Sequence, residues 1–338
     1  MMSRPVQPPP LSAGDLRLVA QSSPAGLAIA TDPHYRYPPH IAAIDELLLE
    51  CAVRRVRRLA VFLPPRHGKS ELISHYTPAW WLGMFPAQRV LLASYEADFA
   101  ASWSLRARQT LELAGGSCFG VALDAESRAR DRWQLTTGGG MTAVGIGGPL
   151  TGRGADLLII DDPVKSQVEA LSPTQRERAW DWFRSVAYTR LEPGAAIVLL
   201  MTRWHHDDLA GRILANAEAE GEPWTVLDLP AIAEADDPLG RRTGEALWPE
   251  RFQLATLDQI RATQGSRWFT SMYQQRPSPE EGGDFPRSWW RRFGPLPASP
   301  DELVQSWDMA FKGEGPGSYV VGQVWVRDGA DAYLVRQV

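Results

Sequence analysis

One stretch of this sequence has the residue types and the spacing of a phosphate-binding loop. An apolar run at 59–63 ends at two prolines and leads to Gly68-Lys69-Ser70, after which an amphipathic segment begins. Where a strand turns into a helix, backbone N–H groups can bind phosphate oxygens, and the helix dipole favours negative charge there. Lys69 would reach the β- and γ-phosphates of a nucleotide, and the Ser70 hydroxyl would be a Mg²⁺ ligand. The stretch therefore predicts a site for ATP and Mg²⁺.

The match to the usual loop pattern is incomplete. That pattern begins with glycine five residues before Gly68, and this chain has Leu63 there. The alternative interpretation is a turn between two core elements, with Lys69 merely solvated. A second nucleotide signature later in the chain argues against that alternative.

This second signature is a pair of carboxylates behind another apolar run. Residues 157–160 are all apolar and lead directly to Asp161 and Asp162. Asp161 would hold Mg²⁺, and Asp162 would orient or deprotonate the attacking water. An ordinary strand with an acidic end is the alternative. The apolar run 195–201 ends at Thr202, which would lie near the γ-phosphate if that run joins the same sheet.

The elements that position these residues alternate between strands and helices. We expect strands at 59–63, 89–93, 155–160 and 195–201, a hairpin within 133–146, and helices at 41–58, 96–113 and 172–191. This alternation predicts an α/β fold with a mainly parallel sheet, whose ligand lies at the carboxyl ends of the strands. The aromatic-rich turn before the first helix either packs against an adenine, through Tyr37 and His40, or staples that helix.

Composition divides the chain into four segments. We expect a Pro-rich flexible arm at 1–30, a P-loop ATPase domain at 31–230, a linker or subdomain at 231–302, and a β-rich element at 303–338. The last segment has predicted strands at 304–309, 318–326 and 332–338.

Composition also excludes several classes of protein. The formal net charge of −5 argues against a protein whose whole surface binds nucleic acid, although one basic channel is still compatible with it. No apolar run approaches the length of a membrane span, and the Pro-rich start is not a signal peptide. Two cysteines are too few for a disulfide framework or a zinc knuckle, so we expect a reducing, cytosolic setting.

Five ordered motifs make the sequence resemble a known family. They lie at 64–72, at 150–156 with the following Asp161-Asp162-Pro163, at 202–212, at 244–252 and at 273–277. Together they resemble the large terminase subunit of tailed bacteriophages or prophages. The resemblance covers nearly the whole chain after the Pro-rich arm.

The resemblance implies a P-loop ATPase domain of the additional-strand (ASCE) type, joined to an RNase H-like nuclease domain. Such a protein uses ATP and Mg²⁺ to package double-stranded DNA through the portal of a procapsid, and its nuclease domain uses two divalent metal ions, Mg²⁺ or Mn²⁺. The family also implies a homo-oligomeric ring on the portal, a small terminase subunit as partner, no membrane, and the cytoplasm of a bacterial host.

Carried over residue by residue, the resemblance makes Lys69 a phosphate ligand and gives Mg²⁺ the ligands Ser70 and Asp161. Asp162 stands where the family often has glutamate, which shortens the reach of the side chain by one methylene. Thr202 falls in the coupling motif, which senses hydrolysis. The other loop residues that would contact the nucleotide are Arg66, His67, Gly68 and Glu71.

Two arginines are placed like the arginine fingers of the family. Arg66 lies within the phosphate-binding loop, and Arg153 precedes the two aspartates. We prefer Arg153, because its glycine-flanked loop could project to a neighbouring subunit. An ion pair between Arg153 and Asp156 is the alternative.

Asp308 matches the first metal-binding aspartate of the nuclease domain. The chain ends before the two other carboxylates that such a fold needs, and we expect Asp328 and Asp331 in a turn away from Asp308. We therefore expect a truncated start of a nuclease domain, without nuclease activity.

Two other functions fit part of the pattern. A helicase-like translocase would need a second RecA-like domain with its own arginine motif, which the sequence after 231 does not resemble. A non-catalytic prophage remnant or assembly protein is favoured by the incomplete nuclease domain. It is disfavoured by the intact Lys69, Ser70, Asp161 and Thr202.

Overall fold

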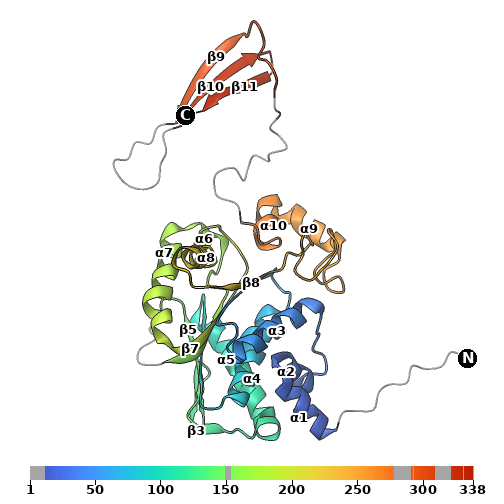
Figure 1. Cartoon of the computed structure of the whole chain (residues 1–338), viewed down its shortest axis with the longest axis vertical. Coiled ribbons are helices and arrows are strands. Elements are labelled where there is room, and N and C mark those ends of the chain that lie inside the picture. The colour runs from blue at the N-terminus through green and yellow to red at the C-terminus, as the bar shows by residue number, and fades with distance from the viewer. Residues whose placement is uncertain are drawn as a thin grey trace, which may run out of the picture. The chain divides into compact units, whose positions relative to one another are not determined.

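The structure is a computed structural model that describes residues 12–148, 154–277, 291, 293–308, 321–329 and 331–337. The chain forms two compact units, Met1–Gly283 and Asp284–Val338. The first unit contains a large sheet with helices on both faces (Figure 1).

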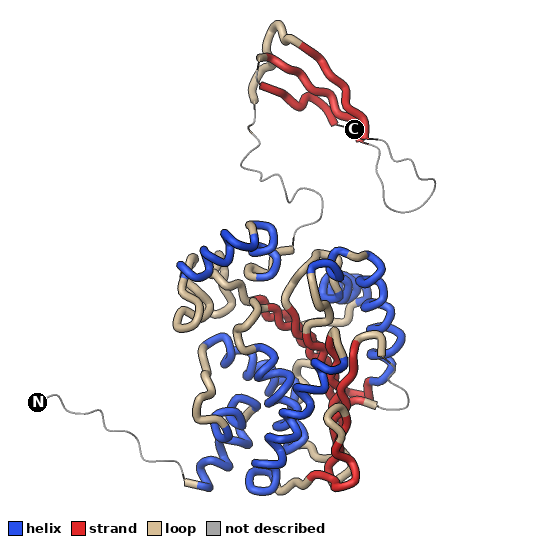
Figure 2. The backbone as a smooth tube through the Cα atoms, turned by 180° about the vertical axis from the view of Figure 1, so that it is seen from behind, coloured by secondary structure: helices blue, strands red, loops and turns tan. Residues whose placement is uncertain are grey.

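Within the described residues, the sheet of the first unit has eight strands, of which six neighbouring ones run parallel. The two strands at one edge, β3 and β4, run antiparallel to their neighbours. Figure 2 shows the strands side by side through the centre of this unit. In order across the sheet they are β3 (Leu123–Arg128), β4 (Arg132–Leu135), β5 (Gly140–Gly145), β2 (Arg89–Ser94), β6 (Ala155–Asp161), β7 (Leu191–Met201), β1 (Arg58–Phe62) and β8 (Thr225–Asp228).

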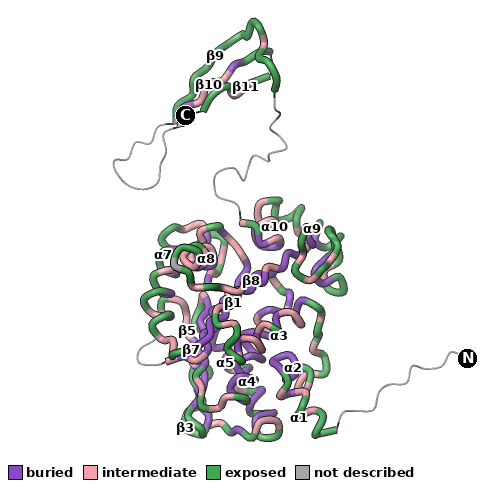
Figure 3. The backbone as a smooth tube through the Cα atoms, in the orientation of Figure 1, coloured by how far each residue is buried: buried purple, intermediate pink, exposed green. Residues whose placement is uncertain are grey.

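The central strands are apolar on both faces, which explains why helices cover both. In β1, Leu59 and Val61 pack into the hydrophobic cluster of one face, whereas Ala60 and Phe62 pack into that of the other. Because successive side chains of a strand point to opposite faces, a continuous apolar run is typical of a doubly covered parallel sheet. Buried residues accordingly concentrate along these strands in Figure 3.

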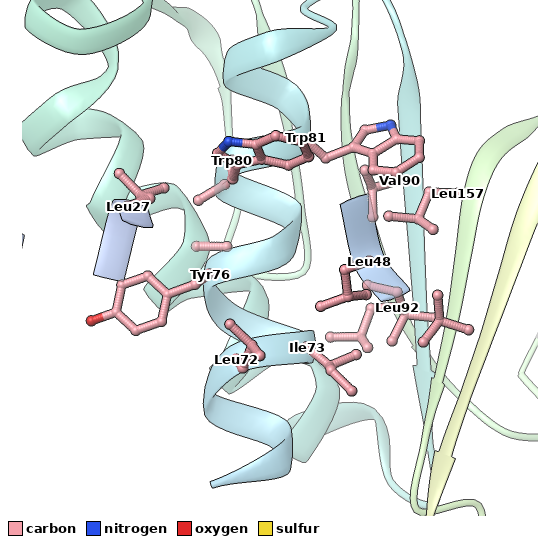
Figure 4. Close-up of a cluster of buried hydrophobic side chains, with 14 of the residues drawn as sticks. Leu27, Leu48, Leu72, Ile73, Tyr76, Trp80, Trp81, Val90, Leu92 and Leu157 are labelled. Atoms are coloured by element: carbon pink, nitrogen blue, oxygen red, sulfur yellow. The ribbon is translucent and has the colours of Figure 1, made fainter. Parts of the chain in front are cut away.

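Five of the described helices pack their apolar sides on the first face, and Figure 4 shows part of this cluster, including Leu27, Leu48, Trp80, Leu92 and Leu157. These helices are α1 (Ala13–Ser22), α2 (Pro24–Thr31), α3 (Pro39–Ala52), α4 (Thr77–Met84) and α5 (Ala97–Ala114). The opposite face is covered by α7 (Pro173–Trp182) and α8 (Leu209–Glu220), and the short α6 (Gln167–Leu171) precedes α7. The expected α/β fold with a mainly parallel sheet is confirmed.

The predicted flexible arm at 1–30 differs from the structure. Residues 1–11 lie outside the described residues, but α1 and α2 occupy most of the remainder, and Ala20 and Leu27 are fully buried. Ser12 and Asp15 form a reciprocal capping box at the start of α1, which is a sequence signature of a helix N-terminus. The prediction gave the prolines of the first ten residues too much weight and extended the arm across two helices.

The segment 231–277, predicted as part of a linker or subdomain, is ordered in the structure. It forms α9 (Leu254–Gln264) and α10 (Ser266–Met272), which share a small hydrophobic cluster. The two ends of the segment are joined by a backbone hydrogen bond, in which the Ala231 N–H donates to the Tyr273 carbonyl at 2.7 Å. The chain divides after 283 rather than near 230, so this segment belongs to the first unit.

The described part of the second unit is an antiparallel sheet of three strands in the order β11-β10-β9. These are β9 (Glu302–Asp308), β10 (Val321–Asp328) and β11 (Asp331–Gln337). Asp308 is paired with Val321 at one end of β10, whereas Asp328 is paired with Asp331 at the other end. The described strands therefore keep these aspartates apart, as the sequence led us to expect.

Two features are absent from the described residues. No group of three or more His, Cys, Asp or Glu side chains there is arranged to hold a metal ion. None of the helices described is both long and apolar enough to cross a membrane.

Candidate nucleotide-binding site

The site lies where three neighbouring parallel strands end. β1 leads into the phosphate-binding loop, β6 ends at Asp161, and β7 leads to Thr202. In the sheet, β7 lies between β1 and β6. Strand β7 is thus the additional strand of the predicted fold type. The register pairs Phe62 with Met201, and Leu200 with Asp161. The three strands thus end at nearly the same level, and their following residues meet at one edge.

Lys69 joins two of the predicted site residues. Its Nζ donates to Asp162 Oδ1 at 3.0 Å and to Thr202 Oγ1 at 2.5 Å. The lysine is only 5 % exposed, which argues against the alternative interpretation of a merely solvated side chain. A buried ammonium group is costly unless it is paired and hydrogen-bonded, and here both conditions are met.

Asp162 has an unusual backbone conformation at the end of β6. Its φ is +43°, in the left-handed region that non-glycine residues rarely adopt and that is often found at functional sites. The Asp162 N–H donates to the Leu200 carbonyl at 2.8 Å, and Asp162 Oδ1 accepts the Thr202 N–H at 2.8 Å. The carboxylate is therefore fixed between β6 and β7, beside the Lys69 ammonium.

Asp161 is fully buried and lies beside two serine hydroxyls. Ser70 Oγ donates to Asp161 Oδ1 at 3.1 Å, and Ser74 Oγ donates to Oδ2 at 2.7 Å. Burial, with the neighbouring Asp162 as a further cause, raises the pKa of the Asp161 carboxyl above its usual range. A cation at this position would offset both effects.

The residues present fit a Mg²⁺ ion. Mg²⁺ prefers hard oxygen ligands and is usually held by one or two carboxylates together with substrate phosphates and water. The Ser70 hydroxyl and the Asp161 carboxylate provide two such oxygens next to the phosphate-binding loop. Because Lys69 is bonded to Asp162 and Thr202 instead, the charge of Asp161 is left for a metal ion to balance.

Two histidine side chains support the predicted phosphate-binding loop by bonding to its main-chain carbonyl groups. His67 Nδ1 lies 2.9 Å from the Pro65 carbonyl oxygen, and His40 Nε2 lies 2.9 Å from the His67 carbonyl oxygen. Because carbonyl oxygens only accept, both ring nitrogens must be the donors. Both rings are fully buried. Both rings bond to the main chain, so these side chains support the loop, and contacts of His40 and His67 with the nucleotide stay a prediction.

Aromatic residues from the segment 231–277 cover these histidines. The Phe252 ring stacks on His67, with ring centres 4.6 Å apart, and Trp248 lies 5.2 Å from His40. Gly68 has a φ of +88°, and a Cβ at this position would lie 3.2 Å from Ile41. The loop is thus fixed by α3 on one side and by residues far along the chain on the other.

The buried histidines give a prediction for the pH dependence of stability. Burial lowers the pKa of His40 to about 4 and that of His67 to about 3, from 6.5. At a pH between the folded and the unfolded pKa of each histidine, the unfolded chain binds more protons than the folded chain. The free energy of unfolding should therefore fall as the pH is lowered below 6.5. The slope is at most about 1.4 kcal/mol per pH unit for each histidine.

Urea unfolding at a series of pH values between 7.5 and 4.5 measures this slope. The variant His40→Gln, which does not titrate, should give a shallower dependence than the wild type. Equal slopes for the two proteins would show that His40 does not contribute.

A cavity of about 460 Å³ opens beside the loop. Arg66, Lys69 and Ser70 line one part of it. The other lining residues include several without a predicted role, namely Tyr35, Arg36, Trp103, Trp248 and Arg251. Tyr37 does not line this cavity, and its hydroxyl donates to Asp45 at 3.3 Å. The aromatic turn therefore does reach the site, but through the residues just before Tyr37.

The remaining predicted residues have different positions. Glu71 lines the cavity and is held by a bidentate ion pair with Arg106. Arg66 is exposed, has a φ of +62°, and makes no hydrogen bond or ion pair within the described part of the chain. Arg153 lies outside the described residues.

Thr202 is connected to α10 through the next residue. The Arg203 N–H donates to Gln275 Oε1 at 3.1 Å, and the Arg203 carbonyl accepts from the Ser271 hydroxyl at 3.1 Å. Gln275 is buried and has a φ of +57°. The motif at 273–277 was visible in the sequence, but nothing in it indicated that its glutamine binds the backbone next to Thr202.

Comparisons with known proteins found one matching family profile and similar solved structures. A family profile described as "Terminase large subunit, T4likevirus-type, N-terminal" matches residues 61–292. The chain is similar in structure to the large terminase of bacteriophage HK97, with 13 % sequence identity and a TM-score of 0.50 over 95 % of this chain and 67 % of that chain. A comparison with curated proteins gave no match.

Structures of a large terminase from a thermophilic bacteriophage also match. One, in complex with ADP, has 12 % identity and a TM-score of 0.40, and another crystal form has 12 % identity and a TM-score of 0.44. Each match covers 86 % of this chain and 67 % of the other. The chain thus spans about two thirds of the length of these solved structures.

Proposed function

This chain belongs to the family described as terminase large subunit, T4likevirus-type, whose N-terminal profile matches more than half of it, and we propose that it hydrolyses ATP to drive double-stranded DNA into a viral procapsid. The observation that carries the proposal is the meeting of Lys69, Asp162 and Thr202 at the ends of β1, β6 and β7. The Ser70–Asp161 pair lies beside them.

The proposed reaction begins with an exchange of partners at Lys69. In the structure, Nζ is bonded to Asp162 and Thr202. The β- and γ-phosphates of ATP would attract this ammonium more strongly than one carboxylate does, because they carry more negative charge. Asp162 would then be free to accept a hydrogen bond from the attacking water and orient it.

The metal ion would be held by Ser70 and Asp161. When bound, Mg²⁺ would neutralise charge on the phosphate oxygens. The backbone N–H groups of the loop would bind and orient the phosphates. Trp248 and Arg36 line the same cavity, and we propose that they border the base and ribose of the nucleotide.

Hydrolysis would be transmitted through Thr202. Loss of the γ-phosphate would return Lys69 to Thr202, and any shift of this strand end would pull on Arg203. Because Arg203 is bonded to Ser271 and Gln275, the movement would reach α10. This connection supports the proposal that ATP turnover moves the segment that follows the ATPase core.

The partners follow from the family. We propose a homo-oligomeric ring on the portal protein, a small terminase subunit as partner, and action in the cytoplasm of a bacterial host. In a complete nuclease domain two divalent metals would be bound, and Asp308 would be a ligand of one of them.

The ATPase activity is tested by measuring phosphate release from the purified chain with Mg²⁺, with and without double-stranded DNA. We expect turnover that requires Mg²⁺ and is absent in the Lys69→Ala variant. No turnover under any condition, including the presence of portal protein, would favour a non-catalytic prophage remnant instead.

The arginine finger gives a second test. If Arg153 serves the site of a neighbouring subunit, Arg153→Ala subunits should still bind ATP but hydrolyse it slowly, because such arginines contribute about 10³–10⁵ in rate. Mixing them with Lys69→Ala subunits should restore some hydrolysis, since one mixed interface then has both groups. Lack of rescue in mixed assemblies that demonstrably form would assign the role to Arg66.

A further inference from the structure

One buried serine next to the site has no role in the reaction proposed above. Ser74 is fully buried, and its hydroxyl donates to Asp161 Oδ2 at 2.7 Å. It does not line the cavity beside the loop. Ser74 therefore cannot touch the nucleotide, and whatever it does must act through Asp161.

The local backbone explains how Ser74 reaches this carboxylate. Residues Glu71–Tyr76 form a π-helical turn directly after the phosphate-binding loop, and such turns are rare and often occur at functional sites. Ser70 stands at the start of this turn and Ser74 four residues later, so that both hydroxyls lie on the side that faces β6. Each donates to a different oxygen of Asp161.

Because each serine bonds to a different carboxylate oxygen of Asp161, the two bonds together fix the orientation of the carboxylate. Oδ2 is occupied by the shorter bond, from Ser74, while Oδ1 is shared with Ser70 at 3.1 Å. The main chain of Asp161 is held as well, because its carbonyl accepts from the Ser94 hydroxyl at 2.5 Å. Among the described residues, the Ser70 hydroxyl alone would hold the carboxylate group against rotation if Ser74 were removed.

We propose that Ser74 is a positioning residue for the divalent cation, because it turns Asp161 so that Oδ1 faces Ser70 and the metal. The inference rests on the proposed ATPase function, since the nucleotide brings the metal to this pair. Partners that orient a metal-binding side chain without touching the metal typically change metal affinity by about 10–100-fold when they are removed. Ser74 has the position of such a partner.

The test compares nucleotide binding with and without the metal. Binding of a fluorescent ATP analogue is measured in EDTA and over a Mg²⁺ titration for the wild type, Ser74→Ala and Ser74→Thr. Ser104→Ala is the matched control, because Ser104 is equally buried and its hydroxyl bonds to the Trp133 ring nitrogen instead. Thermal unfolding of each variant checks that the chain is folded.

We expect Ser74→Ala to raise the Mg²⁺ concentration at half-saturation by about tenfold or more, while its nucleotide affinity in EDTA stays that of the wild type. Ser74→Thr, which keeps the hydroxyl, should restore the Mg²⁺ response, and Ser104→Ala should not change it. If Ser74→Ala does not fold, Ser74→Cys replaces it, because the thiol is a much weaker donor of nearly the same shape.

The inference is overturned if the folded variant needs the same Mg²⁺ concentration as the wild type. It is also overturned if nucleotide affinity falls equally in EDTA and in Mg²⁺, since that result indicates a general role in folding the loop. A wild-type chain that binds no nucleotide at all would overturn the proposed function together with this inference, so the two failures are distinguishable.

Discussion

Replacing Lys69 with alanine is expected to abolish ATP hydrolysis while the chain stays folded. The ammonium group is the one cation that the structure places against both Asp162 and Thr202 in the described part of the chain, where the γ-phosphate would be. Removing one preorganised donor that stabilises developing charge typically costs about 10²–10³ in rate. Because the lysine also binds the ground state of ATP, we expect the loss in kcat/KM to be at least that large.

The fold should tolerate this change even though Lys69 is buried. Its partner Asp162 has a side chain that is 26 % exposed and also accepts the Thr202 N–H, so the remaining carboxylate is neither unpaired nor cut off from water. A carboxylate left fully buried and alone would cost about 3–5 kcal/mol. We expect a much smaller loss here.

Phosphate release and thermal unfolding measure the two parts of this prediction. Lys165→Ala is the matched control, because Lys165 carries the same charge but pairs at the surface with Glu96 at 3.3 Å. Turnover by Lys69→Ala within a few-fold of the wild type, with the control unchanged, would disprove the assignment of the loop.

The positions of the strands, and the edge of the sheet at which they end, could be predicted from the sequence because local patterns determine them. The runs at 59–63, 157–160 and 195–201 consist of apolar residues and a glycine-free backbone, and a strand buried on both faces requires such a run. The carboxyl ends of parallel strands lie at one edge of the sheet. These two facts together predict that Lys69, Asp162 and Thr202 meet at one edge. Each motif alone was too short to distinguish a nucleotide site from an ordinary turn or strand end.

The support of the loop could not be predicted, because it depends on contacts between distant residues. His40 is next to an aromatic turn and His67 is within the loop, and both positions suggested a ligand. Only the packing of Phe252 and Trp248 on these rings shows that they face the interior. Burial is decided here by residues far later in the chain, which no local pattern reports.

The segment 231–277 was predicted as a linker or subdomain, and its composition alone could not decide between the two. Its many Pro, Gly and charged residues are typical of a linker, but Asp237 and Arg241 use their charges within the segment, forming an ion pair at 2.6 Å. Tyr273 and Gln275 then bind the backbone of Ala231 and Arg203. Composition alone does not show whether a polar segment is ordered, because order depends on whether its polar groups form ion pairs and hydrogen bonds.

Replacing Asp162 with asparagine should leave nucleotide binding largely intact and slow hydrolysis strongly. The amide oxygen can still accept the Thr202 N–H, which Asp162 Oδ1 accepts at 2.8 Å, so the strand ends should remain in place. The amide cannot take a proton from water or orient it as a carboxylate does. Loss of a general base typically costs about 10²–10⁴ in rate.

Asp161→Asn is the comparison that separates the two aspartates. Asp161 is fully buried and bonded to Ser70 and Ser74, so its loss of charge should weaken the Mg²⁺ dependence of nucleotide binding, whereas Asp162→Asn should leave that dependence unchanged. Nucleotide affinity with Mg²⁺ and with EDTA, together with single-turnover hydrolysis, distinguishes the variants. If Asp162→Asn loses Mg²⁺-dependent binding while Asp161→Asn loses only hydrolysis, the metal ligand is Asp162 and the roles proposed for the pair are reversed.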